Sequence, residues 1–272
     1  MSADLHARPH DGPERRGLRR GVYLLPSLFT VANLFCGWAC VVYAIRGDFM
    51  TAAPFIGFAI VLDMLDGRIA RMTGTSSAFG VEFDSLADLI SFGMAPAVLV
   101  FQWGLLPLGR LGWAVGFLYL TAAALRLARF NIQPVADKRY FVGMPSPAAA
   151  AVPASTVFYF PGGIDAKPEA YLGMAMLIVV ALLMVSTVRF KSFKTFDLRG
   201  RRSYQWLLLL AALLALIVTY PPTVLVTMAY LYLVSPAIEF GLARVRRSGG
   251  PDGEATRADG DEPPPGAAGP GA

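Results

Sequence analysis

Residues 61–90 read VLDMLDGRIARMTGTSSAFGVEFDSLADLI and hold five of the 19 acidic residues of the chain. The five are Asp63, Asp66, Glu82, Asp84 and Asp88. They lie where two long apolar segments adjoin a short polar connection. An aspartate costs about 2.5 to 3.5 kcal/mol at the middle of a membrane helix and less near its end. We therefore expect a cationic partner among these acids.

The spacing of the acids predicts that four of them converge. Asp63 and Asp66 are three residues apart, and Asp84 and Asp88 are four apart, so each pair shares one face of a helix. A connection predicted at 72–83 makes the two helices antiparallel neighbours. Four crowded carboxylates repel one another, and a divalent cation relieves that repulsion. The alternative is a purely structural network of salt bridges at a helix hairpin.

The overall composition is that of a membrane protein. The chain has 272 residues, 55% of them hydrophobic and 16% charged, and its mean hydropathy is +0.52. A soluble domain has about 25% charged residues. Continuous apolar runs such as Leu172–Val185 indicate helices, and the alternating pattern of a membrane β-barrel is absent from the sequence. The predicted fold is an all-α polytopic bundle.

We predict eight membrane-spanning helices, at residues 23–45, 52–71, 85–106, 112–131, 146–161, 170–188, 205–219 and 222–242. The fifth and seventh are short. Residues 1–22 form a basic cytoplasmic or interfacial segment, 189–204 a basic cytoplasmic loop, and 248–272 a tail whose composition is typical of disorder. The segment 205–247 is interpreted as a pair of C-terminal membrane helices with a basic end.

The distribution of basic residues predicts the orientation of these helices. The net charge is +5, but the Lys and Arg residues lie at the ends of apolar runs, which favours topology signals and contacts with anionic lipid over nucleic acid. With the N-terminus inside, only Arg46, Arg110 and Lys167 of the 24 lie in outside loops. Both termini and the acidic hairpin are then cytoplasmic. Cys36 and Cys40 are interpreted as small packing residues.

The only histidines, His6 and His10, lie in the polar N-terminal segment, so a metal in the apolar body must bind carboxylate oxygens. Such ligands favour Mg²⁺ or Mn²⁺ over Zn²⁺. Gly67, Ala70 and Gly80 accompany the acids, and small residues allow a nucleotide or a backbone to approach closely.

The acids belong to a longer pattern, which reads Asp63-x-x-Asp66-Gly67-x-x-Ala70-Arg71, then eight residues, then Gly80-x-x-x-Asp84-x-x-x-Asp88. All eight positions resemble the signature of the CDP-alcohol phosphatidyltransferase family. The resemblance implies a core of six transmembrane helices over residues 23–188. It also implies metal-dependent transfer of a phosphatidyl group from a CDP-linked lipid to an alcohol, with release of CMP.

The resemblance also implies a role for each matching residue. Asp63, Asp66 and Asp84 would bind metal, and Asp88 would lie close to the metals and act as general base. The cytidine and phosphate pocket would be lined by Gly67, Ala70, Arg71 and Gly80, together with Thr30 and Asn33 from the first helix. Two Mg²⁺ or Mn²⁺ ions are expected, because breaking a pyrophosphate requires charge neutralisation on both phosphates. A homodimer is implied too.

Three further stretches, 84–96, 125–131 and 143–148, resemble one branch of the family, the integral-membrane phosphatidylserine synthases. That branch implies CDP-diacylglycerol and L-serine as substrates in the cytoplasmic membrane of a prokaryote. A planar cation suits the carboxylate of serine. The candidates for contact with the acceptor are Arg126, Arg129, Ser91, Asn131, Lys138 and Arg139. For the arginines the alternative is a topology signal, and for Ser91 and Asn131 a helix cap or an interhelical hydrogen bond.

Two other functions remain open at this point. A member of the same family could use inositol, inositol phosphate, glycerol phosphate or choline as acceptor. A transporter or channel would also place acids in the membrane to bind cations. That second class does not explain the spacing of Gly67, Arg71 and Gly80, and no inverted repeat is visible in the sequence.

Overall fold

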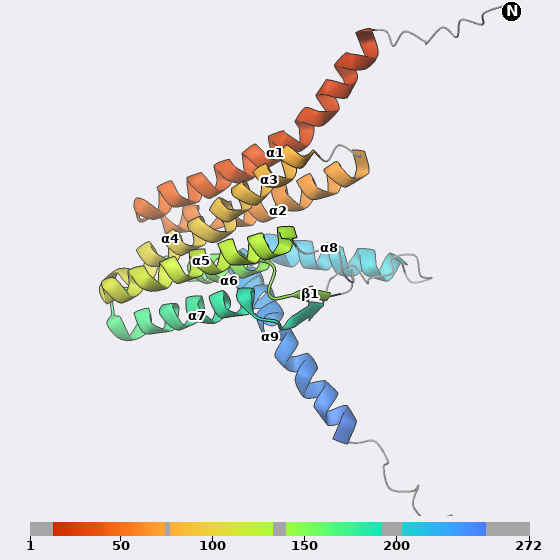
Figure 1. Ribbon diagram of the computed structural model, residues 1–272. Helices are drawn as coiled ribbons and strands as arrows, with labels where there is room; N and C mark the ends of the chain where they lie inside the picture. Colours follow the sequence, from red (N-terminus) through yellow and green to blue (C-terminus); the bar gives the residue numbers. More distant parts are fainter. Residues whose placement is uncertain (1–12, 74–76, 133–139, 192–202, 249–272) are drawn as a thin grey trace, which may run out of the picture. The chain divides into compact units, whose positions relative to one another are not determined.

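The computed structural model describes residues 13–73, 77–132, 140–191 and 203–248, and most of these are helical. Every segment predicted to be a membrane helix is helical (Figure 1). The elements are α1 (Pro13–Ile45), α2 (Phe49–Thr73), α3 (Ala78–Asp88), η1 (Leu89–Met94), α4 (Ala95–Val100), η2 (Phe101–Leu105), η3 (Leu106–Leu108), α5 (Arg110–Ile132), β1 (Tyr140–Val142), α6 (Ser146–Tyr159), α7 (Lys167–Val185), β2 (Arg189–Lys191), α8 (Ser203–Thr219) and α9 (Pro221–Ser248). Met1–Val234 forms one compact unit and Ser235–Ala272 another.

Within the described residues, five helices are long and apolar enough to cross a membrane. They are Ser27–Ile45, Phe49–Ile69, Ala78–Leu108, Arg110–Ile132 and Lys167–Val185. The prediction of an all-α, multi-pass membrane protein is therefore confirmed. Helices α6 and α8 have 14 and 17 residues, fewer than the about 20 that a full crossing needs. The predicted crossings by α6, α8 and α9 stay predictions.

Helix α3 begins at Ala78, so the start predicted at residue 85 is wrong. The cause is a helix cap, because the hydroxyl of Ser77 accepts a hydrogen bond of 3.0 Å from the backbone N–H of Gly80. Since α2 extends to Thr73, the connection predicted at 72–83 is much shorter. Asp84 consequently lies well inside the helix rather than at its entrance.

The structure also differs from the prediction near the two basic segments. Helix α1 begins at Pro13, so it includes part of the segment predicted as a lead-in at 1–22. Part of the loop predicted at 189–204 forms β2, which pairs antiparallel with β1, with Phe141 opposite Phe190. Lys138, Arg139 and the tail predicted beyond residue 248 lie outside the described residues.

The long helix from Ala78 to Leu108 contains a π-helical turn, η1, which ends two residues before Pro96. Proline has no N–H, and its ring crowds the carbonyl four residues earlier, which here belongs to Phe92. The wider π turn relieves that crowding. Tyr119 of α5 donates a hydrogen bond of 3.2 Å to the carbonyl of Phe92. Pro96 therefore favours the wider turn, and α5 supplies a hydroxyl donor to the carbonyl of Phe92.

A second π turn, η2, precedes Pro107 in the same way. The carbonyl four residues earlier is that of Trp103, which accepts a hydrogen bond of 2.7 Å from the backbone N–H of Ile164. The turn between α6 and α7 therefore lies against η2. Gly163 of that turn also lies near Phe49 at the start of α2. Arg46, Arg110 and Lys167 are the basic residues predicted to lie in outside loops. The three turns that hold them thus gather at one end of the bundle.

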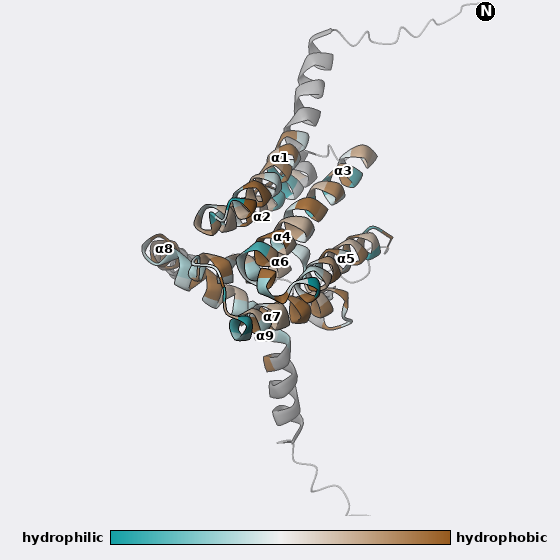
Figure 2. Ribbon diagram, turned by 90° about the vertical axis from the view of Figure 1, so that its left-hand side faces the viewer, coloured by the Kyte–Doolittle hydropathy of each residue, from teal (hydrophilic) through white to brown (hydrophobic). Residues whose placement is uncertain are grey.

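The core is formed by small and branched residues between tightly packed helices. Helix α1 packs along α2, α5 along α7, and α2 against α6 (Figure 1). Cys36 and Cys40 are buried and free, which confirms their interpretation as packing residues. Large apolar side chains such as Trp38 and Leu172 instead point outward, 63% and 73% exposed. Exposed apolar side chains suit a lipid environment, and Figure 2 shows that hydrophobic residues, in brown, recur along many of the helices.

Gly37→Ala should destabilise the protein by about 1 to 3 kcal/mol because it overpacks the contact between α1 and η1. A Cβ at position 37 would lie 2.6 Å from Ser91 Oγ and 2.9 Å from Ser91 Cα. Gly57→Ala is the matched control, since a Cβ there meets nothing within 4 Å. Thermal unfolding of the purified variants measures the difference, and equal melting temperatures would contradict this packing argument.

Candidate active site

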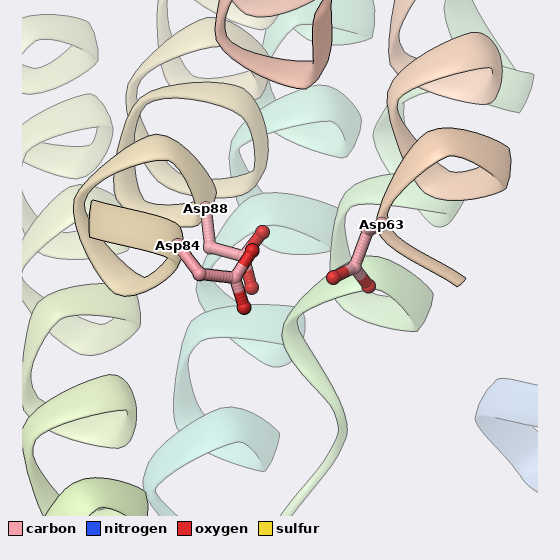
Figure 3. A group of neighbouring side chains, drawn as sticks. All are labelled: Asp63, Asp84 and Asp88. Carbon is pink, nitrogen blue, oxygen red and sulfur yellow. The ribbon is translucent and has the colours of Figure 1, made fainter. Parts of the chain in front are cut away.

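Three carboxylates converge between α2 and α3. One oxygen from each of Asp63, Asp84 and Asp88 lies within 4.8 Å of the other two. Asp84 and Asp88 point from neighbouring turns of α3 toward Asp63 on α2 (Figure 3). The spacing of these acids in the sequence predicted this convergence, and the structure confirms it for the three.

Asp66 lies beside this group and is bound to α1. Its side chain is 5% exposed, and its carboxylate accepts a hydrogen bond from the hydroxyl of Thr30. Asp66 also interacts electrostatically with Asp84. It is not one of the three carboxylates that the structure brings within 4.8 Å. The fourth acid of the predicted cluster is therefore adjacent, with one oxygen occupied by a hydroxyl donor.

Asn33 of α1 holds Asp88. Its amide Nδ2 donates a hydrogen bond of 3.1 Å to Asp88 Oδ1. The hydroxyl of Ser91, which is fully buried, donates in turn to the backbone carbonyl of Asn33 at 2.9 Å. The sequence left two roles open for Ser91, contact with the acceptor or an interhelical hydrogen bond, and the structure shows the hydrogen bond. Thr30 and Asn33, expected in the CDP-lipid pocket, lie directly against the acids.

The carboxylate group fits a divalent cation. Asp84 Oδ1 is buried and has no hydrogen-bond partner among the described residues, and the same holds for Asn33 Oδ1. A buried charged oxygen without a donor is costly, and a cation supplies the missing interaction. The donor set is all oxygen, which suits hard ions such as Mg²⁺ and Mn²⁺. The residues that fit such an ion best are Asp63, Asp84 and Asp88.

The small residues of the predicted pocket lie on the same two helices as the acids. Gly67 follows Asp66 directly on α2, and Gly80 lies in the first turn of α3. Ala70 and Arg71 belong to the last turns of α2, but their side chains lie outside the described residues. Their predicted contact with cytidine and phosphate stays a prediction.

Arg126 of α5 provides a cation close to the carboxylates. Its Nε donates to the carbonyl of Met144 at 2.6 Å, and its Nη1 donates to the hydroxyl of Ser146 at 2.5 Å. It interacts electrostatically with Asp88 and with Tyr232 of α9. The motifs around Arg126 were visible in the sequence, whereas nothing in the sequence distinguished Tyr232 from other aromatic residues in an apolar helix.

The remaining candidates for acceptor contact lie farther along α5 and beyond it. Arg129 is half-buried, three residues after Arg126 on the same helix. Asn131 is exposed, and its Nδ2 donates a hydrogen bond of 3.0 Å to the hydroxyl of Ser85 on α3. That bond ties α5 to the helix that carries Asp84 and Asp88. The structure therefore gives Asn131 an interhelical partner.

Chemically, the arrangement combines a carboxylate cage for cations, a carboxylate on the same site that can accept a proton, and an arginine beside them. Such a site can neutralise phosphates and bind an anionic group at the same time. The acids come from α2 and α3, their hydrogen-bond partners from α1, and the arginine from α5. A reacting group between them would be surrounded by four helices.

Comparisons with known proteins agree with this chemistry. A sequence model described as CDP-alcohol phosphatidyltransferase matches residues 23–217. The CDP-diacylglycerol–serine O-phosphatidyltransferase of Helicobacter pylori is 36% identical over 219 residues, which cover 78% of this chain and 89% of that protein. The enzyme of the same name from Bacillus subtilis is 31% identical, over 67% of this chain and 98% of its own length. The archaetidylserine synthase of Methanothermobacter thermautotrophicus is 34% identical, over 61% and 69%.

Proposed function

The chain belongs to the CDP-alcohol phosphatidyltransferase family, and we propose that it transfers a phosphatidyl group from CDP-diacylglycerol to the hydroxyl of L-serine. The products are phosphatidylserine and CMP. The observation that carries this proposal is the convergence of Asp63, Asp84 and Asp88, with Arg126 beside them. The names of the similar proteins, which specify serine as acceptor, support the choice of alcohol.

We propose that two Mg²⁺ or Mn²⁺ ions bind at this site. Asp63, Asp84 and Asp88 would hold them, and Asp66 would contribute the carboxylate oxygen that Thr30 does not engage. When bound, the ions neutralise the two phosphates of the CDP-lipid and polarise the phosphorus–oxygen bond that breaks. Asp84 Oδ1, which is buried and has no hydrogen-bond partner in the described ranges, supports this assignment. Gly67, Ala70, Arg71 and Gly80 would border the nucleotide, where small residues leave room for a flat base.

Asp88 would act as the general base. Its carboxylate takes the proton from the serine hydroxyl while that oxygen forms a bond to the phosphorus that carries diacylglycerol. The bond between this phosphorus and the oxygen of CMP breaks, and CMP leaves with the electron pair. The Asn33 amide, which donates to Asp88 Oδ1, fixes the orientation of the carboxylate, so the other oxygen is directed to the hydroxyl.

Arg126 would bind the carboxylate of serine. A guanidinium has five N–H donors, and Met144 and Ser146 each receive one from Arg126. Within the described part of the chain the other donors remain for a ligand, and the two bonds hold the guanidinium plane in place. Arg129, half-buried on the same helix, would add positive charge behind it. Lys138 and Arg139 would extend this charge toward the adjoining loop.

We also propose that the acids lie at the cytoplasmic side of a prokaryotic membrane and that the protein forms a homodimer. The turns with Arg46, Arg110 and Lys167 gather at the other end of the bundle, and few basic residues are typical of outside loops. CDP-diacylglycerol can reach the acids from the bilayer. Exposed apolar side chains of the spanning helices, such as Trp38 and Trp113, suit lipid or a second copy.

The release of CMP tests the function directly. The full-length protein in detergent or lipid nanodiscs is supplied with CDP-diacylglycerol, Mn²⁺ or Mg²⁺, and one acceptor at a time. We expect CMP release and a serine-labelled lipid with L-serine, and at least about tenfold less with ethanolamine, which lacks the carboxylate that Arg126 binds. Inositol phosphate, glycerol phosphate and choline are tested in parallel.

The outcomes separate the possible acceptors. Faster CMP release with another alcohol than with serine would refute serine as the natural acceptor and would support the alternative acceptor within the family. Equal rates with serine and ethanolamine would refute the carboxylate contact of Arg126. No CMP release with any alcohol would refute the proposed reaction.

A further inference from the structure

The π turn η1 begins directly after Asp88, the residue that closes α3. A π turn accommodates one residue more than an α turn, so replacing it by an α turn would rotate the two flanking segments by about 100° relative to each other. The side chains before the turn are the acids, and those after it pack into the core. The turn therefore determines which way Asp84 and Asp88 point when the rest of the helix is packed.

A buried side chain of α5 is hydrogen-bonded to the turn. Tyr119 is fully buried, and its hydroxyl donates to the carbonyl of Phe92 inside the turn at 3.2 Å. Pro96 cannot donate to that carbonyl, because it has no N–H. In an α-helical register that carbonyl would therefore have no backbone donor, and a buried carbonyl without a donor is costly. Tyr119 therefore stabilises the turn in the arrangement that directs the carbonyl of Phe92 toward α5.

The turn is attached to α1 as well, and from there to Asp88. Ser91 inside the turn donates to the carbonyl of Asn33, and the side chain of Asn33 donates to Asp88. The close approach at Gly37 allows this contact, since any Cβ there would overlap Ser91. A shift of the turn would displace Ser91, Asn33 and Asp88 together.

We infer that Tyr119 is a positioning residue for the carboxylate site, acting through the π turn rather than by contact with the substrate. Its hydroxyl keeps the turn in the register that directs Asp84 and Asp88 toward Asp63. Its consequences for metal affinity and for turnover rest on the proposed function.

Tyr119→Phe should lower the affinity for Mn²⁺ by about tenfold and kcat by about 10- to 100-fold, because displacement of a reacting group by about 1 Å has an effect of that order. The KM for serine should change little. Thr121→Val is the matched control, since Thr121 lies on the same helix and, among the described residues, its hydroxyl donates to the carbonyl of Phe117 within that helix. Calorimetric titration of the full-length protein with Mn²⁺, without substrate, measures the affinity independently of any reaction.

The double variant Pro96→Ala/Tyr119→Phe separates positioning from stability. Replacing the proline by alanine restores a backbone N–H that can donate to the carbonyl of Phe92. The melting temperature should therefore return toward that of the wild type while Mn²⁺ affinity and kcat stay low. If Mn²⁺ affinity and kcat recovered together with the melting temperature, the inference would be overturned. It would also be overturned if Tyr119→Phe bound Mn²⁺ as tightly as Thr121→Val does. If the wild type binds Mn²⁺ but releases no CMP, the proposed function fails, and the Mn²⁺ titrations still decide this inference.

Discussion

Asp88→Asn is expected to lower kcat for CMP release by about 10³-fold, because a well-placed general base contributes about 10²- to 10⁴-fold. An asparagine preserves the size of the side chain and can still accept the hydrogen bond from Asn33 through its carbonyl oxygen. The loss should therefore reflect the missing proton acceptor rather than a collapsed site. Binding of CDP-diacylglycerol should weaken by less than about tenfold, since the other three acids remain. Single-turnover kinetics and equilibrium binding measure the two effects separately.

Glu82→Gln is the matched control for this variant. Glu82 is an exposed acid on the same helix, and it does not belong to the group of three carboxylates. It should keep the kcat of the wild type. Turnover of Asp88→Asn within about threefold of that control would refute the assignment of Asp88 as the base, because so small an effect lies far below that of general base catalysis.

The acidic site could be predicted from the sequence because its geometry is mostly local. Residues three or four apart share a helix face wherever the helix is placed, so the convergence of Asp63 with Asp84 and Asp88 followed once the two helices were taken as antiparallel neighbours. The start predicted for α3 at residue 85 is wrong because Ser77 caps the helix directly before Ala78. The sequence does contain this signal, because an N-cap serine commonly accepts a hydrogen bond from the backbone N–H three residues later, as Ser77 does from Gly80.

The contacts across the bundle could not be predicted in the same way. Thr30 and Asn33 bind acids that are 36 and 55 residues away, and resemblance alone assigned them to the substrate pocket. Tyr119 meets the carbonyl of Phe92 because the packing of α5 places a hydroxyl there. Periodicity identifies an apolar helix face, but it does not determine which residue of a neighbouring helix that face meets.

The second expected result with a large effect concerns Asp84. Asp84→Asn should raise the Mn²⁺ concentration for half-maximal activity by about 100-fold, as loss of a charged ligand removes a few kcal/mol of binding free energy. Asp84 Oδ1 is buried without a hydrogen-bond partner among the residues that the structure describes, so the cation is the interaction it lacks. Unlike Asp88→Asn, this variant should regain part of its turnover at saturating Mn²⁺. Activity measured over a range of Mn²⁺ concentrations tests this difference.

Thermal unfolding distinguishes a metal site from a structural network of acids and bases. A ligand that binds only the folded state stabilises it, by about 2.7 kcal/mol at a concentration of 100 Kd. The control variant is Asp48→Asn, because Asp48 caps the first turn of α2 at the other end of the bundle. The wild type and this control should both melt at a higher temperature when Mn²⁺ is present. Asp84→Asn should lose most of that increase. If Mn²⁺ stabilised Asp84→Asn as much as the wild type, Asp84 would not bind the metal, and the buried oxygen would need a partner from elsewhere in the chain.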